Sequence, residues 1–154
     1  MKEIQLTQGK TALVDDDVYD YLNQWKWYAS KIGHTFYAYR HVQRKNVAMH
    51  REILGVQNKS VLVDHIDFNG LNNTKENLRT CSIEENNRHS RRIMRKNKTG
   101  YRGVYKYLRY YLAQITIDGK ARHIGCFDNP VDAAKTYDEY AKQLHGDFAI
   151  LNFK

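Results

Sequence analysis

Apolar residues in the N-terminal third alternate between strand-like and helix-like spacings. Residues 10–15 (KTALVD) form a short apolar run that predicts a strand. In residues 15–25, apolar side chains recur from Val18 onward at the i, i+3, i+4, i+7 spacing of an amphipathic helix. Two β-rich runs around a KIGH turn predict a hairpin, and residues 46–55 predict a short helix. Residues 1–56 are therefore expected to form a small mixed scaffold.

The middle of the chain is polar and rich in asparagine. Residues 61–67 (VLVDHID) predict a strand, and the NGLNN that follows predicts a turn. Residues 82–92 predict a helix that begins at Ser82, because Ser82 and Glu85 have the spacing of a capping box. A run of lysines and arginines with little apolar content follows, and it predicts a basic linker at residues 91–99.

The C-terminal third changes to β-rich composition. Residues 101–127 contain an Asp-Gly pair that predicts a hairpin turn. In the middle strand, alternation places Ala113 and Ile115 on the face opposite Gln114. An Asn-Pro pair then begins a helix that should end near Gly146. The expected fold is a three-stranded antiparallel sheet packed on one helix.

The charge balance changes the list of candidate partners. The 154-residue chain carries 25 Lys and Arg against 17 Asp and Glu, a formal net charge of +8. This length suits one ordinary domain or two small ones. A basic balance of this size favours a polyanionic partner, most often nucleic acid, although it also serves plain solubility.

Cysteine and hydropathy patterns argue against several protein classes. The two cysteines, Cys81 and Cys126, are far apart and no Cys-x-x-Cys occurs, so a zinc site with four protein ligands is not expected. Free thiols in a reducing compartment are the default for such a chain. No apolar run approaches the ~20 residues of a membrane span, and no charged-then-apolar leader opens the sequence. We therefore expect a cytoplasmic protein with no signal peptide and no membrane partner.

Asp64 and His65 are adjacent in the predicted strand and precede an unusual concentration of amide side chains. Neighbouring residues of a strand point to opposite faces, which suits a metal ligand and a base that have different targets. Hydrolysis of a phosphodiester uses such a pair, because a base activates water while a cation stabilises the charge on the phosphate. Carboxylate and amide oxygens are hard ligands that suit Mg²⁺ or Mn²⁺ with several waters retained.

The pattern VDHID…N…NN…ENL…EENN resembles the HNH nuclease motif of phage and intron homing endonucleases. The resemblance implies a ββα-metal finger of the His-Me type at about residues 61–90, folded around one divalent ion. It implies that Asp64 and Asn86 bind the metal. It also implies that His65 is the general base and that Asn77 holds the loop and orients the histidine through a backbone contact.

Neighbouring polar residues have open or alternative roles. Taken alone, an Asp-His pair is typical of a surface histidine in a polar loop, and it is the agreement of four positions and their spacing that favours a nuclease. His89 lies one turn beyond Asn86 and is a reserve ligand. We interpret Asn72 and Asn73 as turn formers rather than ligands. His50, on the preceding predicted helix, is interpreted as a core or capping residue rather than a catalytic one.

Residues 101–153 resemble the plant Apetala-type (ethylene-response-factor, ERF) DNA-binding domain in the segments YRGV, LAQI, IGCF, AAKTYDEYA and ILNF. In that family the three-stranded sheet enters the major groove and its arginines contact bases and phosphates, as guanidinium geometry allows. The candidates for DNA contact are Arg102, Lys106, Arg109, Gln114, Thr116, Lys120 and Arg122, with Arg91, Arg92 and Arg95 of the linker along phosphates. The sequence departs from the plant pattern at Tyr105, Tyr107, Tyr111 and His123, so the plant target is not carried over.

These patterns together predict an α+β chain with a nuclease domain at 1–90, a basic linker at 91–99 and an ERF-like domain at 100–154. Homing nucleases that carry both modules form a known group, and residues 3–54 resemble their N-terminal segments. The resemblance implies a metal-dependent, site-recognising DNA endonuclease of a bacterial or phage-infected cell, which uses one Mg²⁺ or Mn²⁺ and leaves 3′-hydroxyl and 5′-phosphate ends on double-stranded DNA. A single site favours a monomer that nicks, whereas double-strand cutting would need a dimer or two successive nicks. The alternatives are a non-cleaving DNA-binding regulator, and a structure-specific or RNA-directed nuclease with the same finger.

Overall fold

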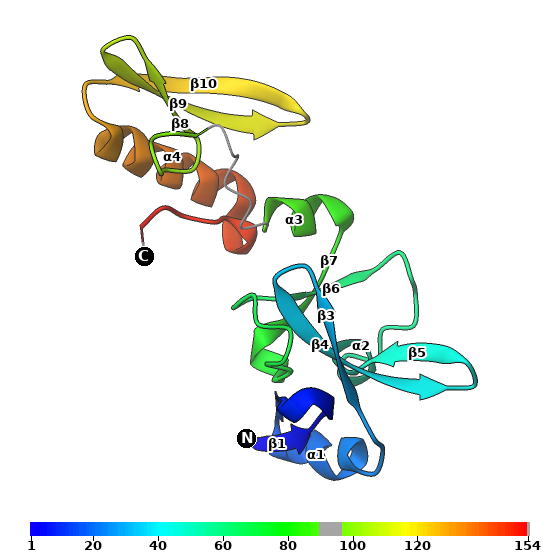
Figure 1. Ribbon diagram of the computed structural model, residues 1–154. Helices are drawn as coiled ribbons and strands as arrows, with labels where there is room; N and C mark the ends of the chain where they lie inside the picture. The colour runs from blue at the N-terminus through cyan, green and yellow to red at the C-terminus, as the bar shows by residue number, and fades with distance from the viewer. Residues whose placement is uncertain (90–96, 154) are drawn as a thin grey trace. The chain divides into compact units, whose positions relative to one another are not determined.

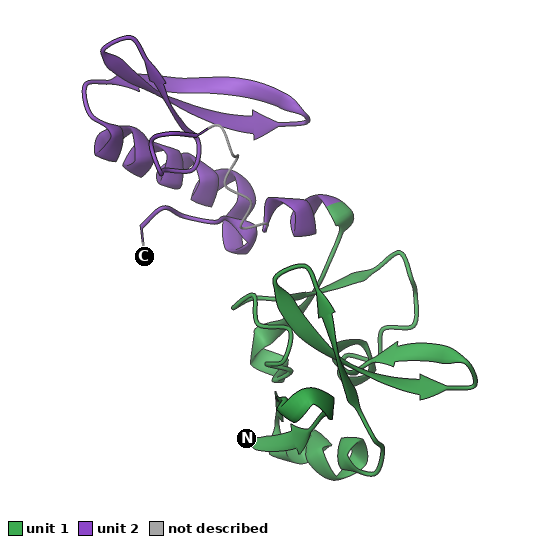
Figure 2. Ribbon diagram, in the orientation of Figure 1, with its two compact units in different colours: residues 1–83 green, residues 84–154 purple. Residues whose placement is uncertain are grey.

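The computed structural model describes residues 1–89 and 97–153, and it shows helices combined with several small sheets (Figure 1). The predicted α+β class is therefore confirmed. The chain divides into two compact units, Met1–Ile83 and Glu84–Lys154 (Figure 2). Among the helices that the structure describes, none is long and apolar enough to cross a membrane.

The first unit is built from short strands and short helices. Its elements are β1 (Lys2–Gln5), a 3-10 turn (Thr7–Gly9), β2 (Thr11–Val14), α1 (Asp16–Asn23), β3 (Tyr28–Ile32), β4 (Thr35–Val42), β5 (Lys45–Ala48), α2 (Met49–Ile53), β6 (Leu62–His65), a second 3-10 turn (Lys75–Asn77) and β7 (Leu78–Cys81). β1 pairs with β2, β4 pairs with both β3 and β5, and β6 pairs with β7, all antiparallel.

One hydrophobic core joins β1, β2, α1, β4 and α2. Ile4, Leu22 and Met49 are at most 2% exposed in it. Burying an aliphatic side chain of this size contributes roughly 1.5–3 kcal/mol. The apolar spacing of α1 thus directs one face of the helix into the core and leaves its acidic face in solvent.

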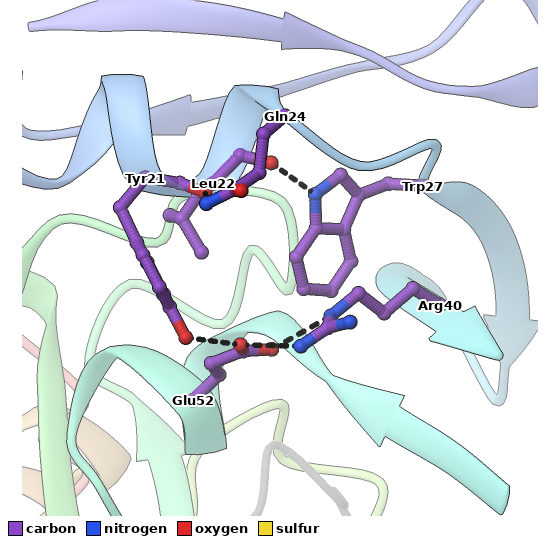
Figure 3. A network of polar contacts seen from close by, with 6 residues as sticks. All are labelled: Tyr21, Leu22, Gln24, Trp27, Arg40 and Glu52. Carbon is purple, nitrogen blue, oxygen red and sulfur yellow. Dashed lines mark hydrogen bonds and ion pairs between the residues drawn. The ribbon is translucent and has the colours of Figure 1, made fainter. Parts of the chain in front are cut away.

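A polar network beside this core fastens α1, β4 and α2 together (Figure 3). The Glu52 carboxylate accepts hydrogen bonds from Arg40 Nη2 at 2.6 Å and Nε at 3.0 Å, and from the Tyr21 hydroxyl at 3.0 Å. The Arg40 guanidinium lies 3.9 Å from the ring centroid of Trp25. The indole of Trp27, 3% exposed, donates at 2.8 Å to a main-chain carbonyl of α1. These contacts fix the platform that carries the candidate site.

The second unit consists of α3 (which begins at the last residue of the first unit) and a sheet covered by a helix. Its elements are α3 (Ile83–Arg88), β8 (Val104–Tyr107), β9 (Tyr110–Ile117), β10 (Lys120–Phe127), α4 (Pro130–His145) and a 3-10 turn (Gly146–Phe148). The sheet is antiparallel in the order β10-β9-β8, and α4 lies along one face of it (Figure 1). Alanines at 133, 134 and 141, each at most 1% exposed, let the helix approach closely.

The sequence predicted most of these elements and missed a few. The β3–β4 hairpin and the Asp-Gly turn between β9 and β10 are confirmed, and so is the Asn129 cap, whose Oδ1 accepts from the Asp132 N–H at 2.9 Å. The prediction of helix at residues 46–48 is wrong, because these residues pair with β4 as part of β5. Two strands, β1 and β7, were not predicted from the hydrophobic pattern. β1 (KEIQ) contains a single apolar residue, and β7 (LRTC) carries Arg and Thr between its two apolar ends, so neither shows a clear apolar run.

Candidate active site

Asp64 and His65 end strand β6, which pairs with β7. Alternation along β6 sends their side chains to opposite faces, as the sequence predicted. Asp64 lies directly opposite Arg79, and its Oδ2 accepts from Arg79 Nε at 3.0 Å and Nη2 at 2.8 Å. The Asp64 residue is 9% exposed, so this pair is a largely buried, charge-assisted contact that orients the carboxylate.

His65 is buried among other rings. It is 5% exposed, and its ring centroid lies 5.1 Å from that of His50 and 5.6 Å from that of Tyr37, both edge to face. Its Nε2 lies 3.3 Å from Oδ1 of Asn73. Burial lowers the pKa of His65 below its usual value, although Asn73 and nearby carboxylates act in the opposite direction. His65 is therefore neutral at pH 7, the state that a general base requires.

Asn77 closes the loop between β6 and β7. Its Oδ1 accepts from the Asp67 N–H at 3.0 Å, and its Nδ2 donates to Asp67 Oδ1 at 2.9 Å and to the Asn72 carbonyl at 2.8 Å. Its own carbonyl accepts from the Ile66 N–H at 2.9 Å. Asn77 thus holds the backbone immediately after His65. Although burial alone would raise the pKa of Asp67, hydrogen bonds from Asn72, Asn69 and Asn77 lower it.

The same loop is fastened to the N-terminal scaffold. The Asn73 N–H donates to the Leu13 carbonyl and the Leu13 N–H donates to the Leu71 carbonyl, both at 2.8 Å. The Gly70 N–H donates to Thr35 Oγ1 at 3.1 Å. A Cβ on Gly70 would lie 2.4 Å from a main-chain oxygen of β4, so only glycine fits at this contact. The scaffold therefore determines where the loop, and with it His65, is placed.

The predicted site residues fall in both units. Asp64, His65 and Asn77 lie together on the β6–β7 hairpin. Asn86 lies on α3 and His89 follows it, buried, both in the second unit. The pairing of Asn86 with Asp64 therefore stays a prediction. In residues 1–89 and 97–153, no group of three His, Cys, Asp or Glu side chains is placed to hold a metal.

Sequence reasoning missed some neighbours of His65. Asn73 was interpreted only as a turn former, but its side chain is fully buried and contacts the His65 ring. The Arg79 partner of Asp64 was not recognised. It is detectable only once the register of β6 and β7 is known. His50 is buried, as expected for a core residue. Burial, with lesser effects of His65 and Arg51, lowers the pKa of His50 to about 3.

The candidate DNA-contacting residues lie in the second unit. Within the described residues they are Arg102, Lys106, Arg109, Gln114, Thr116, Lys120 and Arg122, whereas Arg91, Arg92 and Arg95 lie outside the described residues. Gln114 and Thr116 point away from α4, since the alternating Ala113 and Ile115 are buried against it. Register pairs Arg122 with Ile115 and Lys106 with Tyr111. These two basic residues are exposed, but they share the helix-facing side of the sheet rather than the face of Gln114.

A carboxylate and a neutral buried histidine at the end of one hairpin, in a basic α+β chain, make up the donor set that phosphodiester hydrolysis uses. No family model matches the chain. A protein of Acanthamoeba polyphaga mimivirus named "Uncharacterized HNH endonuclease L560" is 30% identical over 146 residues, which cover 94% of this chain and 76% of that protein. The chain belongs to the HNH endonuclease family, and at that level it is a nuclease.

Proposed function

We propose that this chain is a metal-dependent endonuclease that binds double-stranded DNA and hydrolyses its phosphodiester bonds, with His65 as the general base. The observation that carries the proposal is a buried His65 that follows an oriented carboxylate on β6 and precedes a loop fixed by Asn77 and by the scaffold. HNH endonucleases generally depend on a divalent metal, which agrees with the hard-oxygen ligands of the motif.

His65 accepts the proton of the attacking water. A neutral imidazole with a lowered pKa retains its lone pair at physiological pH, so protonation does not compete with the reaction. Asn77 contributes by holding the backbone that follows His65, through four hydrogen bonds that leave the loop little freedom. The ring is thereby pre-positioned before DNA arrives, which lowers the entropic cost of reaching the reactive geometry.

Asp64 and Asn86 would hold one Mg²⁺ or Mn²⁺, with water in the remaining positions, as these ions tolerate. The contact between Asp64 Oδ2 and Arg79 supports the fit, because ligating carboxylates are commonly oriented by an outer hydrogen-bond partner. When bound, the ion would stabilise the negative charge that develops on the phosphate and the departing oxygen. The expected products carry 3′-hydroxyl and 5′-phosphate ends, as the family resemblance implies.

The second unit supplies duplex binding as an ERF-like domain. Its sheet presents a face free of α4 that carries Gln114 and Thr116, together with the exposed Tyr105 and Tyr107. The basic residues Lys106, Arg109, Lys120 and Arg122 are exposed on the same sheet, and register places Lys106, Lys120 and Arg122 on its helix-facing side. A duplex on this face would meet polar and aromatic side chains, which are suited to base edges, and the basic residues of the sheet are the candidates for phosphate contact.

The domain organisation follows the motifs. The nuclease domain comprises residues 1–90, the linker 91–99 and the DNA-binding domain 100–154. Two such domains on one chain match a homing endonuclease of a bacterial or phage-infected cell, in which one part binds the target and the other cuts it. One nuclease site per chain gives a monomer that nicks, and double-strand cutting would then require a second copy or a second event.

Nicking of supercoiled plasmid tests the nuclease. Purified wild type, His65→Ala and His34→Ala are incubated with Mg²⁺ or Mn²⁺, and with EDTA. His34 lies on the exposed β3–β4 turn and serves as the matched control. Wild type and His34→Ala should nick, EDTA should abolish nicking, and His65→Ala should be slower by roughly 10²–10⁴-fold, the usual contribution of a general base. Duplex binding without nicking under either ion would identify a non-cleaving DNA-binding regulator instead.

A charge-insertion pair tests the sheet face. Thr116→Glu and Gln143→Glu each add one negative charge at an exposed position, the first on the sheet face and the second on α4. Thr116→Glu should weaken duplex binding by at least about tenfold, since a like charge against the phosphate backbone is repelled. Gln143→Glu should have little effect. Equal losses in the two variants would show that the free face of the sheet does not contact DNA.

A further inference from the structure

The side chain of Asn73 is the polar group that meets the His65 ring. Asn73 is fully buried, and its Oδ1 lies 3.3 Å from His65 Nε2. The backbone of Asn73 is fixed as well, because its N–H donates to the Leu13 carbonyl at 2.8 Å. A fully buried amide is an unusual choice for a residue whose purpose is to form a turn, since turn residues are normally exposed.

We propose that Asn73 is a positioning residue that sets the tautomer of His65, so that Nε2 carries the proton and Nδ1 carries the lone pair that receives the proton of water. This inference rests on the proposed role of His65 as the base. A neutral imidazole has one donor and one acceptor nitrogen, and the hydrogen bond at one nitrogen decides which is which. A carbonyl oxygen accepts but cannot donate, so Oδ1 requires the proton on Nε2.

The ring neighbours of His65 restrict the movement of its imidazole, so the contact with Asn73 determines the tautomer. Tyr37 and His50 lie edge to face against His65, with ring centroids 5.6 and 5.1 Å away, and they restrict rotation of its ring. His50 stays neutral at physiological pH, so it does not repel the proton on Nε2. With the ring plane held by packing, the remaining freedom is the choice of tautomer, and Asn73 is the hydrogen-bond partner that the structure shows for Nε2.

The Nδ2 atom of Asn73 bears on which way the amide faces His65. Its Nδ2 is buried and has no hydrogen-bond partner among the residues that the structure describes. If the amide were turned around, its N–H would face Nε2 and would impose the opposite tautomer, with the lone pair on Nε2. The two orientations therefore make opposite predictions for the protonated nitrogen, and a measurement on the unmodified protein can separate them.

The first experiment reads the tautomer directly. Long-range ¹H–¹⁵N correlation spectra are recorded on wild-type protein in EDTA near neutral pH, and the His65 signals are assigned by comparison with His65→Gln. We expect a protonated Nε2 and an unprotonated Nδ1. An unprotonated Nε2 overturns the proposal. Because this readout needs no activity, it remains informative even if the chain fails to nick DNA.

The second experiment reads the catalytic consequence. Asn73→Ala removes the acceptor, Asn73→Asp keeps an oxygen that accepts from Nε2–H, and Asn69→Ala is the matched control. Asn69 accepts a loop hydrogen bond from the Leu71 N–H at 3.1 Å and is exposed. Asn73→Ala should lower kcat by about 10²-fold with KM for DNA unchanged, in line with the loss of an outer partner that orients a catalytic ligand.

Recovery of kcat in Asn73→Asp distinguishes a positioning role of Asn73 from a purely structural one. Asn73→Asp should restore at least about a tenth of wild-type kcat, and Asn69→Ala should leave kcat within about twofold, since neither removes the acceptor at Nε2. Each variant is first checked for native tryptophan fluorescence, because both tryptophans lie in the first unit. A folded Asn73→Ala with wild-type kcat, or equal losses in Asn73→Ala and Asn69→Ala, contradicts the proposal. If His65→Ala nicks like wild type, the proposed base is wrong, whichever tautomer the spectra show.

Discussion

Acidification should destabilise the first unit through His50, whose imidazole is buried against the rings of His65 and Tyr37. The pKa of His50 is about 3 in the folded protein, compared with 6.5 for an ordinary histidine, and burial is the main cause. Between these two values the unfolded chain binds a proton that the folded chain does not. Stability therefore rises with pH across this window, is complete above about 6.5, and is lost as the pH falls toward about 3.

The magnitude follows from the same two values. One pKa unit corresponds to about 1.4 kcal/mol, so acidification from about pH 7 to about pH 4 should remove about 3 kcal/mol of unfolding free energy through His50 alone. Because domains are stable by only about 5–15 kcal/mol, this loss is a large part of the total. His65, whose pKa is also lowered, adds a contribution of the same sign.

Urea titrations followed by tryptophan fluorescence measure the effect in the correct unit, since Trp25 and Trp27 both belong to residues 1–83. Wild type is compared with His50→Phe, which keeps a ring, and with His50→Gln, which keeps a polar group. Either substitution shifts stability at every pH, so the comparison uses only the change between about pH 7 and about pH 4. Both variants should show a change smaller by about 3 kcal/mol than wild type. If either retains the wild-type pH dependence, the assignment of the titration to His50 is refuted.

Further predictions concern the loop and the carboxylate. Gly70→Ala should destabilise the first unit by about 2 kcal/mol, because the added Cβ would lie 2.4 Å from a main-chain oxygen that cannot move aside. Gly33→Ala, with open space around its Cβ, should cost only the strain of its positive φ. Arg79→Met should cost about 3 kcal/mol by removing the guanidinium that donates to the buried Asp64 Oδ2, and the Asp64→Asn/Arg79→Met double variant should recover part of that loss. Asn77→Ala should lower nicking by at least about tenfold while leaving duplex binding unchanged, because it frees the backbone after His65. The first prediction is wrong if Gly70→Ala is as stable as Gly33→Ala. The second is wrong if the double variant is no more stable than Arg79→Met, and the third is wrong if Asn77→Ala nicks DNA normally.

Local signals in the sequence were the reliable ones. The Asp-Gly turn and the Asn129 cap were correctly predicted because each depends on a few adjacent residues. The strand at 45–48 was missed because its pairing with β4 has no local signal in the sequence: the two-residue turn Gln43–Arg44 has positive φ at both residues but lacks the Gly, Asn or Asp that marks such turns. The same limit explains Asn73, whose contact with His65 exists only after the loop is attached to β2.

The sheet of the second unit shows how register limits such predictions. Alternation along β9 correctly placed Gln114 and Thr116 opposite the buried residues. It could not place Lys106 and Arg122, because their faces depend on how β8 and β10 align with β9. A register shift between His123 and Gly125 alters that alignment further along β10. Charge therefore identified exposed cations, but only the paired strands show which cations share a face.

The sequence predicted a scaffold at residues 1–56 and a metal finger at about 61–90 within one nuclease domain, and in the structure the scaffold holds the loop between β6 and β7. A two-stranded hairpin such as β6–β7 is at best marginally stable alone in water. Its loop is held from outside, by Leu13 on β2, by Thr35 on β4, and by Asp15, which accepts from the Lys75 N–H at 2.7 Å. The histidine that the motif supplies is in turn packed against Tyr37 and His50 of the scaffold. In the proposed function the scaffold is thus part of the active site, because the motif would supply the chemical groups and the preceding strands and helices hold them in place.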